Sequence, residues 1–176
     1  MTRMILFLLS LGASATASAQ TSSSPGAPPK AACTAPEHRQ FDFWVGSWIV
    51  SQTGSEGLVA HSLIEKLYGG CVIRENWMPF KGTEGGSLNN YVLEGGEWRQ
   101  TWLDASNARV EFSGGMVGDA MVLTGFWKDV NGPGQSGLIR MTYSKAGDGS
   151  VRQLGEFSAD QGKSWSPSFD FTYRPR

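Results

Sequence analysis

A short stripe of aromatic and amide side chains carries the strongest indication of binding chemistry in this sequence. Trp98, Gln100 and Trp102 are spaced two residues apart, so a β-strand places all three on one face. Two aromatic walls with one amide between them suit a flat or apolar molecule that needs one hydrogen bond to fix its orientation. Core packing is the competing interpretation, because small barrels fill their interior with side chains.

Other residues are candidates to extend this ligand-binding wall. Asn89 and Tyr91 lie on the preceding predicted strand and would add hydrogen bonds, whereas Trp127 and Trp77 would add stacking surfaces. Arg140 interrupts an otherwise apolar segment. If its side chain points inward, it would bind a carboxylate or phosphate head group; if it points outward, it is surface charge.

Carboxylates within predicted strands are the candidates for catalysis. A buried carboxylate with a raised pKa serves as a general acid or base, and a pair supports glycoside or isomerase chemistry. Four glutamates lie within predicted strands: Glu65, Glu75, Glu111 and Glu156. We take Glu75 and Glu156 as weak catalytic candidates. Solvent exposure, or pairing with an arginine, is the competing interpretation for all four.

Several kinds of active site lack the residues that they need. Two histidines, His38 and His61, and two cysteines that are expected to pair do not supply a conventional zinc site. The sequence also contains no nucleophile elbow, phosphate-binding loop or dinucleotide fingerprint. We therefore predict no metal and no cofactor. The segment Ser158–Trp165 resembles the Asp-box turn of sialidases, but a single copy predicts a turn and not a glycosidase.

The first residues have the pattern of an export leader. Arg3 is followed by the apolar run Met4–Leu11 and by the small-x-small site Ala17-Ser18-Ala19. We expect a signal peptide at residues 1–19, a disordered tether rich in Ser, Pro and Ala at residues 20–35, and one folded domain at residues 36–176. The apolar run is too short to span a bilayer comfortably. We therefore expect a periplasmic or extracellular protein with no membrane span.

Charge and cysteine usage limit the partners further. The formal net charge is −1 at pH 7, without a basic or acidic block, so nucleic acid is a poor candidate partner. In an oxidising compartment an even number of cysteines favours a disulfide. We predict a Cys33–Cys71 bond that ties the end of the tether to the domain; two free thiols are the alternative.

Short β-patterned segments alternate with glycine-rich turns along the rest of the chain. This spacing predicts an all-β fold, and a closed antiparallel up-and-down barrel leaves no exposed edge strand. A short helical turn over residues 40–44 would close one end with Phe41, Phe43 and Trp44; Gly46 would then turn the chain sharply, and Trp48 would plug that end. The predicted strands are 47–52, 58–68, 71–78, 86–93, 97–104, 109–113, 120–128, 137–144, 151–158 and 168–174.

The pattern Phe-x-Phe-Trp-x-Gly-x-Trp over residues 41–48 resembles the start of calycin-type barrels. Together with segments 70–77, 98–102 and 169–173, it resembles more closely an uncharacterised family of exported bacterial lipocalin-like proteins. The resemblance covers nearly the whole predicted domain and implies a calycin-type barrel of about ten strands. Nitrobindins, a related group, hold haem through a histidine near the C-terminus. This chain has no histidine there, and this departure from the nitrobindin pattern argues against haem.

Three functions fit these observations. The leading hypothesis is a secreted protein that binds a small apolar or amphipathic molecule in the barrel lumen. An isomerase or hydrolase that uses a buried glutamate in the same lumen is the second. A structural or interaction protein of the cell envelope, with a filled barrel, is the third. Because a fold does not determine a function, the sequence leaves the choice open, including whether the protein is an enzyme.

Overall fold

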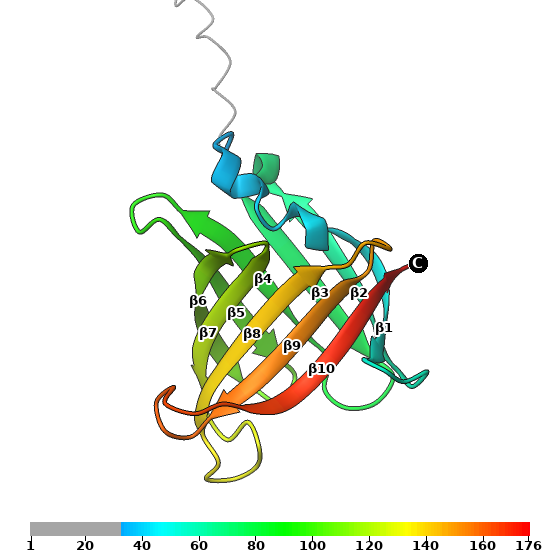
Figure 1. The fold of residues 1–176 in the computed structure, drawn as a ribbon, viewed down its shortest axis with the longest axis vertical. Coiled ribbons are helices and arrows are strands. Elements are labelled where there is room, and N and C mark those ends of the chain that lie inside the picture. The colour runs from blue at the N-terminus through cyan, green and yellow to red at the C-terminus, as the bar shows by residue number, and fades with distance from the viewer. Residues whose placement is uncertain (1–32) are drawn as a thin grey trace, which may run out of the picture. The chain divides into compact units, whose positions relative to one another are not determined.

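In the computed structural model, which describes residues 33–176, ten antiparallel strands close into an up-and-down barrel (Figure 1). Each strand pairs with its neighbours in sequence, and β1 closes the barrel against β10. The predicted signal peptide and residues 20–32 of the predicted tether lie outside the described residues. The strands are β1 Gly46–Gln52, β2 Leu58–Leu67, β3 Val72–Pro79, β4 Gly85–Val92, β5 Glu97–Asp104, β6 Arg109–Val117, β7 Ala120–Trp127, β8 Gly137–Lys145, β9 Val151–Ser158 and β10 Ser166–Pro175.

The predicted fold class is confirmed, and the period-2 patterns determine which side chains enter the lumen. In β5, Trp98 and Gln100 are buried, whereas Arg99 between them is exposed. In β8, Ile139, Met141 and Tyr143 are buried in the same alternation. The lumen-facing residues form one connected core, so a shift of one residue in any strand would turn its apolar set toward solvent.

The largest difference from the predicted strands lies in β6. The sequence predicts that this strand ends at residue 113, before a turn at Gly114-Gly115, but β6 continues to Val117. Gly114 pairs with both Trp98 and Leu123, and a Cβ atom on it would collide with the Val122 carbonyl oxygen. The glycine is therefore needed for close approach of the strand backbones, and the hairpin turn lies beyond it.

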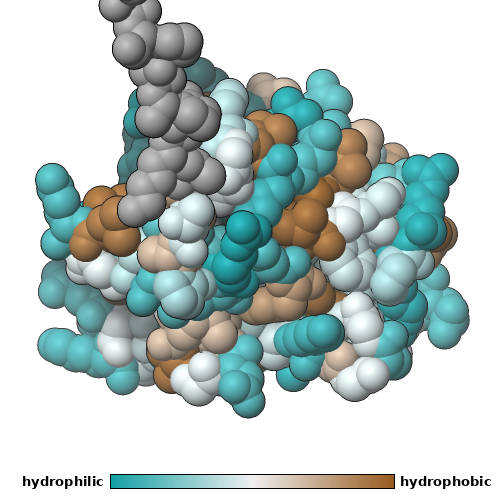
Figure 2. All heavy atoms as spheres, turned by 90° about the horizontal axis from the view of Figure 1, so that it is seen from above, coloured by the Kyte–Doolittle hydropathy of each residue, from teal (hydrophilic) through white to brown (hydrophobic). Residues whose placement is uncertain are grey.

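One end of the barrel is closed by the segment that precedes β1. Two 3₁₀ turns, η1 Pro36–Arg39 and η2 Asp42–Trp44, lie across this end (Figure 1). Phe41 and Trp44 are fully buried, stack on each other at 4.9 Å, and pack against Tyr143 in the lumen. We call Phe41 and Trp44 the aromatic plug. Figure 2, which looks onto this end, shows hydrophilic side chains with smaller hydrophobic groups between them.

The plug is attached to the barrel through Gly46 and Trp48. Gly46 begins β1 with a φ of 158°, a positive value that residues with a Cβ atom rarely adopt. A side chain at this position would also lie 3.1 Å from the Trp48 ring, so the glycine leaves room for that indole. The Trp48 indole packs edge-on against Tyr173 and donates a 2.9 Å hydrogen bond to the Trp44 carbonyl oxygen. Trp48 thus supports the plug from inside the barrel.

A disulfide anchors the chain just before the plug. Cys33 is bonded to Cys71, as predicted, and their Cα atoms are 5.1 Å apart. Cys71 follows the 3₁₀ turn η3 Tyr68–Gly70 and precedes β3. Lys66 at the end of β2 adds an ion pair with Asp42 and a hydrogen bond to the His38 carbonyl oxygen. No helix among residues 33–176 is long and apolar enough to cross a membrane.

Loss of the disulfide is expected to destabilise the folded protein. The bond closes a loop with a sequence separation of 38, for which the chain-entropy model gives up to about 4 kcal/mol. We expect the double variant Cys33→Ser/Cys71→Ser to lower the free energy of unfolding by about 2–4 kcal/mol in urea titrations. An unchanged free energy of unfolding would show that the bond does not hold the plug. Alkylation of the denatured, unreduced protein checks that the parent carries the bond.

Candidate functional site

The lumen contains a cavity of about 190 Å³. Its lining combines large aromatic side chains with a smaller number of polar ones. The lining residues are Glu75, Trp77, Gln100, Trp102, Phe112, Trp127, Met141, Tyr143, Gln153, Phe169, Phe171 and Tyr173. The leading binding hypothesis requires such a space, whereas a completely filled barrel would not contain it.

Half-buried aromatic residues surround the outer part of the cavity. Since β1 starts at the plug, odd-numbered strands run away from it and even-numbered strands run back toward it. Trp77, Trp102 and Trp127 lie near the ends of β3, β5 and β7. Phe169 lies in the first half of β10, and Phe171 pairs with Gln52, the last residue of β1. All five therefore lie toward the barrel end opposite the plug. We call these five residues the aromatic mouth.

Glycines on neighbouring strands let two of these rings lie against the backbone. A Cβ atom on Gly85 would lie 2.8 Å from the Trp102 ring, and one on Gly155 would collide with the Phe169 ring. Asp104 holds Trp102 from outside, because its carboxylate accepts a 2.9 Å hydrogen bond from the indole Nε1. The orientation of the Trp102 and Phe169 rings thus depends on Gly85, Gly155 and Asp104, which are not aromatic.

The inner part of the cavity, next to the plug, is polar. Glu75, Gln100, Tyr143, Gln153 and Tyr173 form what we call the polar floor, and all five are buried. Both carboxylate oxygens of Glu75 have a hydroxyl neighbour: Ser62 Oγ lies 3.3 Å from Oε1, and Ser87 Oγ lies 3.1 Å from Oε2.

A directed chain of hydrogen bonds ends on Glu75. Asn89 Nδ2 donates to the Ile73 carbonyl oxygen at 3.1 Å, which determines the orientation of the amide, and also to Ser87 Oγ at 3.0 Å. The Oδ1 atom of Asn89 accepts a 2.6 Å bond from Gln100 Nε2. Since Ser87 Oγ already accepts, its own proton is available for Glu75 Oε2. The network therefore presents Glu75 Oε2 with a donor.

The other side of the floor is built from amide and phenol groups. Tyr173 donates a 2.6 Å hydrogen bond to Gln153 Oε1, and Gln153 Nε2 donates a 3.0 Å bond to the Tyr143 hydroxyl. Burial raises the pKa of both tyrosines, and the nearby Glu75 charge raises both further, so both phenols stay protonated at neutral pH.

Glu75 is the one strongly perturbed carboxyl group in the floor. Burial raises its pKa to about 7, although hydrogen bonds from Ser87 and Ser62 and the nearby Tyr173 hydroxyl oppose the shift. None of the ion pairs formed by residues 33–176 includes Glu75. At neutral pH the floor therefore holds a carboxyl group that changes readily between hydrogen-bond donor and acceptor.

The structure divides the sequence-predicted residues among four places: the cavity lining, the layer behind it, the plug end and the outer face. Gln100, Trp102, Trp127 and the catalytic candidate Glu75 line the cavity together. Asn89 lies fully buried behind Gln100 and orients it. Neither Trp98 nor Tyr91 is among the lining residues, and both pack at the plug end. Trp98 donates a 3.1 Å hydrogen bond to Gln40 Oε1 and meets Phe41 edge-on; Tyr91 packs against His38 and Trp98.

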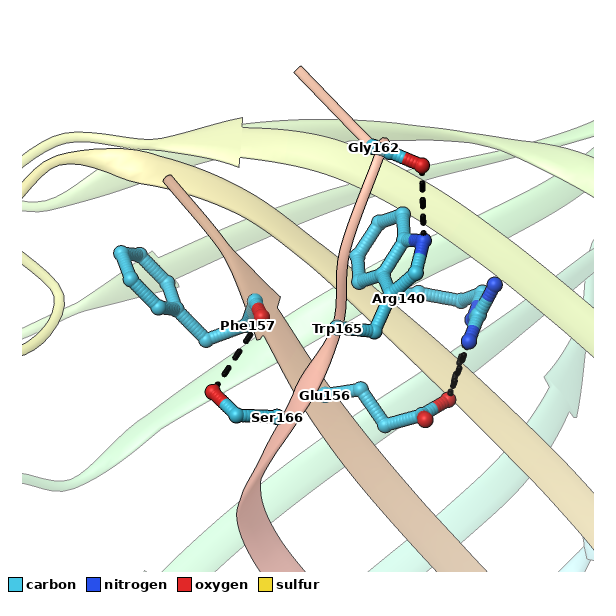
Figure 3. Close-up of polar contacts among 6 residues, drawn as sticks. All are labelled: Arg140, Glu156, Phe157, Gly162, Trp165 and Ser166. Carbon is cyan, nitrogen blue, oxygen red and sulfur yellow. Dashed lines mark hydrogen bonds and ion pairs between the residues drawn. The ribbon is translucent and has the colours of Figure 1, made fainter. Parts of the chain in front are cut away.

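Arg140 and Glu156 lie on the outer face of the barrel and do not line the cavity. They form an ion pair at 2.8 Å, and the Arg140 guanidinium lies 4.2 Å from the centre of the Trp165 ring (Figure 3). Trp165 belongs to the Asp-box-like turn, where it donates a 3.1 Å hydrogen bond to the Gly162 carbonyl oxygen. Of the two orientations considered for Arg140, the structure shows the outward one.

Sequence reasoning did not assign Tyr143, Gln153, Phe112 or Met141 to a site. The alternation of Ile139, Met141 and Tyr143 in β8 marks one shared face, which was the available signal for Tyr143. Gln153 gives no such signal, because a lone glutamine in a strand is more often solvent-exposed.

Two further observations concern metal binding and the similarity of the chain to known proteins. Among residues 33–176, no group of three or more His, Cys, Asp or Glu side chains is placed to hold a metal ion. The chain matches no protein-family model, and no curated protein matches it.

The raised pKa of Glu75 predicts a specific pH dependence of stability. Between pH 4.5 and about 7 the unfolded state releases the Glu75 proton while the folded state keeps it. Stability from this residue is therefore present below pH 4.5 and is lost as the pH rises to 7, by about 3 kcal/mol in total. We expect Glu75→Gln to remove this loss, so that the variant gains stability relative to the parent as the pH rises. Urea unfolding of both proteins across this range measures the difference, and a difference that stays constant with pH contradicts the prediction.

Proposed function

We propose that this protein is an exported, calycin-type barrel that binds a small aromatic or apolar molecule with one polar group in its lumen. The observation that carries the proposal is a lumen cavity that combines an aromatic mouth with a polar floor. Rings stack on the mouth residues, and the polar group of the ligand reaches Glu75, Gln100 or Gln153. This arrangement orients an amphipathic molecule with its polar end inward.

The size of the cavity limits the ligand. Pockets for drug-sized molecules measure roughly 300–1,000 Å³, whereas this one measures about 190 Å³. The proposed ligand therefore has one ring or two fused rings. The barrel topology, the leader-like start of the chain and the Cys33–Cys71 disulfide support the proposed family and the proposed periplasmic or extracellular location.

Removal of one mouth indole is expected to weaken binding. We expect at least one of naphthalene, 2-naphthol and indole to bind the parent protein with 1:1 stoichiometry in isothermal titration calorimetry. Trp102→Ala removes a stacking surface, so the dissociation constant should rise about tenfold. Trp165→Ala is the matched control, because this indole lies on the outer face, stacked on Arg140.

Two results would contradict the proposal. One is the absence of binding for all three compounds. The other is binding that Trp165→Ala weakens and Trp102→Ala leaves unchanged. Thermal unfolding of each variant confirms that the barrel is folded before titration.

A second candidate function is proton transfer, which the pKa of Glu75 near 7 favours. A general base in the floor would remove a carbon-bound proton from a lumen ligand and return it elsewhere on the molecule, as in an isomerase. Native mass spectrometry of the gently purified protein would identify a bound ligand. Incubation of that ligand in D₂O with the parent, but not with Glu75→Gln, should then introduce deuterium into it.

A further inference from the structure

We propose that the lumen selects a cationic ligand, an aromatic or apolar amine whose ammonium group pairs with Glu75. This inference rests on the proposed function and assigns the chemical class of the ligand. It is carried by the surroundings of Glu75, by the contrast with the other acidic residues of the barrel, and by the composition of the mouth.

The carboxylate of Glu75 is arranged to accept hydrogen bonds but lacks a positive partner. Only 6% of the residue is exposed, and it lines the cavity. The directed network through Asn89 gives Oε2 a hydroxyl donor, and Ser62 gives Oε1 another. A buried carboxylate is costly when it has no counter-charge, so an incoming ammonium group supplies what the lumen lacks.

Three acidic residues on the outer strand faces have the positively charged partner that Glu75 lacks. Glu156 pairs with Arg140, Asp170 pairs with Arg152, and Glu111 pairs with Arg109. No Lys, Arg or His is among the residues that line the cavity. Within the part of the chain that the structure describes, Glu75 is the buried carboxylate, and it has no positively charged partner.

The mouth favours the same class of ligand. Trp77, Trp102 and Trp127 present indole rings, which attract cations more strongly than other aromatic rings. An aromatic amine would place its ring among these indoles and its ammonium group deeper, toward the floor. An acidic ligand would instead bring a second negative charge beside Glu75, which the site disfavours.

The titratable groups that face Glu75 do not change their charge near neutral pH. The titratable groups that face it are the phenols of Tyr143 on β8 and Tyr173 on β10, and both stay protonated. The neighbouring strands β2 and β4 contribute the serines Ser62 and Ser87. The pKa of Glu75 near 7 means that ligand affinity depends on pH in a measurable range.

Three phenyl compounds of similar size test the proposal. They are 2-phenylethylamine, the neutral 2-phenylethanol and the anionic 3-phenylpropionate, each titrated by calorimetry into the full mature protein at pH 8. We expect the amine to bind roughly tenfold more tightly than the alcohol, because it makes a charge-assisted bond, and the anion to bind most weakly. Amine affinity should fall as the pH is lowered from 8.5 to 5.5, because Glu75 gains a proton while the amine, with a pKa near that of lysine, about 10.4, stays charged.

Glu75→Gln should lower amine affinity roughly tenfold and abolish its pH dependence. Glu111→Gln is the matched control, because it removes a carboxylate from the outer face.

If the alcohol binds as tightly as the amine, or if amine affinity does not rise with pH, the cation proposal is overturned while lumen binding stands. If none of the compounds binds, the proposed function itself fails. The compound series and the pH series use only the parent protein, so they decide the question even if the Gln variant does not fold.

Discussion

The packing of Phe41 and Trp44 into one barrel end is the interaction on which the other features of the lumen depend. These two rings are fully buried and contact Tyr143 and Tyr173 directly. Because they exclude water from that end, the polar floor next to them is surrounded by protein, and burial raises the pKa of Glu75. The disulfide and the Lys66 contacts hold the plug segment in place. Closure at one end leaves the aromatic mouth as the approach to the cavity.

The polar floor shows how a buried acidic group is tolerated inside an aromatic lumen. Two neutral hydroxyl groups, of Ser62 and Ser87, satisfy much of the hydrogen-bonding capacity of Glu75, and Asn89 donates in turn to Ser87. Such bonds lessen the desolvation penalty but do not replace a counter-charge, so the folded protein keeps the proton on Glu75 up to about pH 7. A carboxyl group without a counter-charge inside the lumen therefore lowers the stability of the folded protein as the pH rises toward 7.

Glu75 and Glu156 illustrate how strongly position alters the same residue type. Both lie in strands and both were equal candidates by sequence. Glu156 on the outer face meets Arg140 across the β8–β9 pair, and Trp165 covers the guanidinium (Figure 3). Glu75 faces inward and meets serines. The Arg140–Glu156 pair is partly buried on the outer face, where ion pairs contribute little to stability. The buried carboxyl group of Glu75, by contrast, dominates the electrostatics of the lumen.

The sequence alone predicts the all-β class, the closed barrel and the disulfide partners. It also predicts the alternation of Trp98, Gln100 and Trp102, because period-2 patterns, glycine turns and cysteine number are local properties. It does not predict the position of each residue along the barrel axis. Trp98 and Trp102 share a face, but at about 3.3 Å per residue they lie some 13 Å apart along the strand; one supports the plug and the other forms the mouth. Tertiary structure also decided that Glu75 points inward and Arg140 outward. It likewise brought Tyr143 and Gln153 into the site. Strand register across the closed barrel sets which side chains meet, and register is a long-range property that no single segment contains.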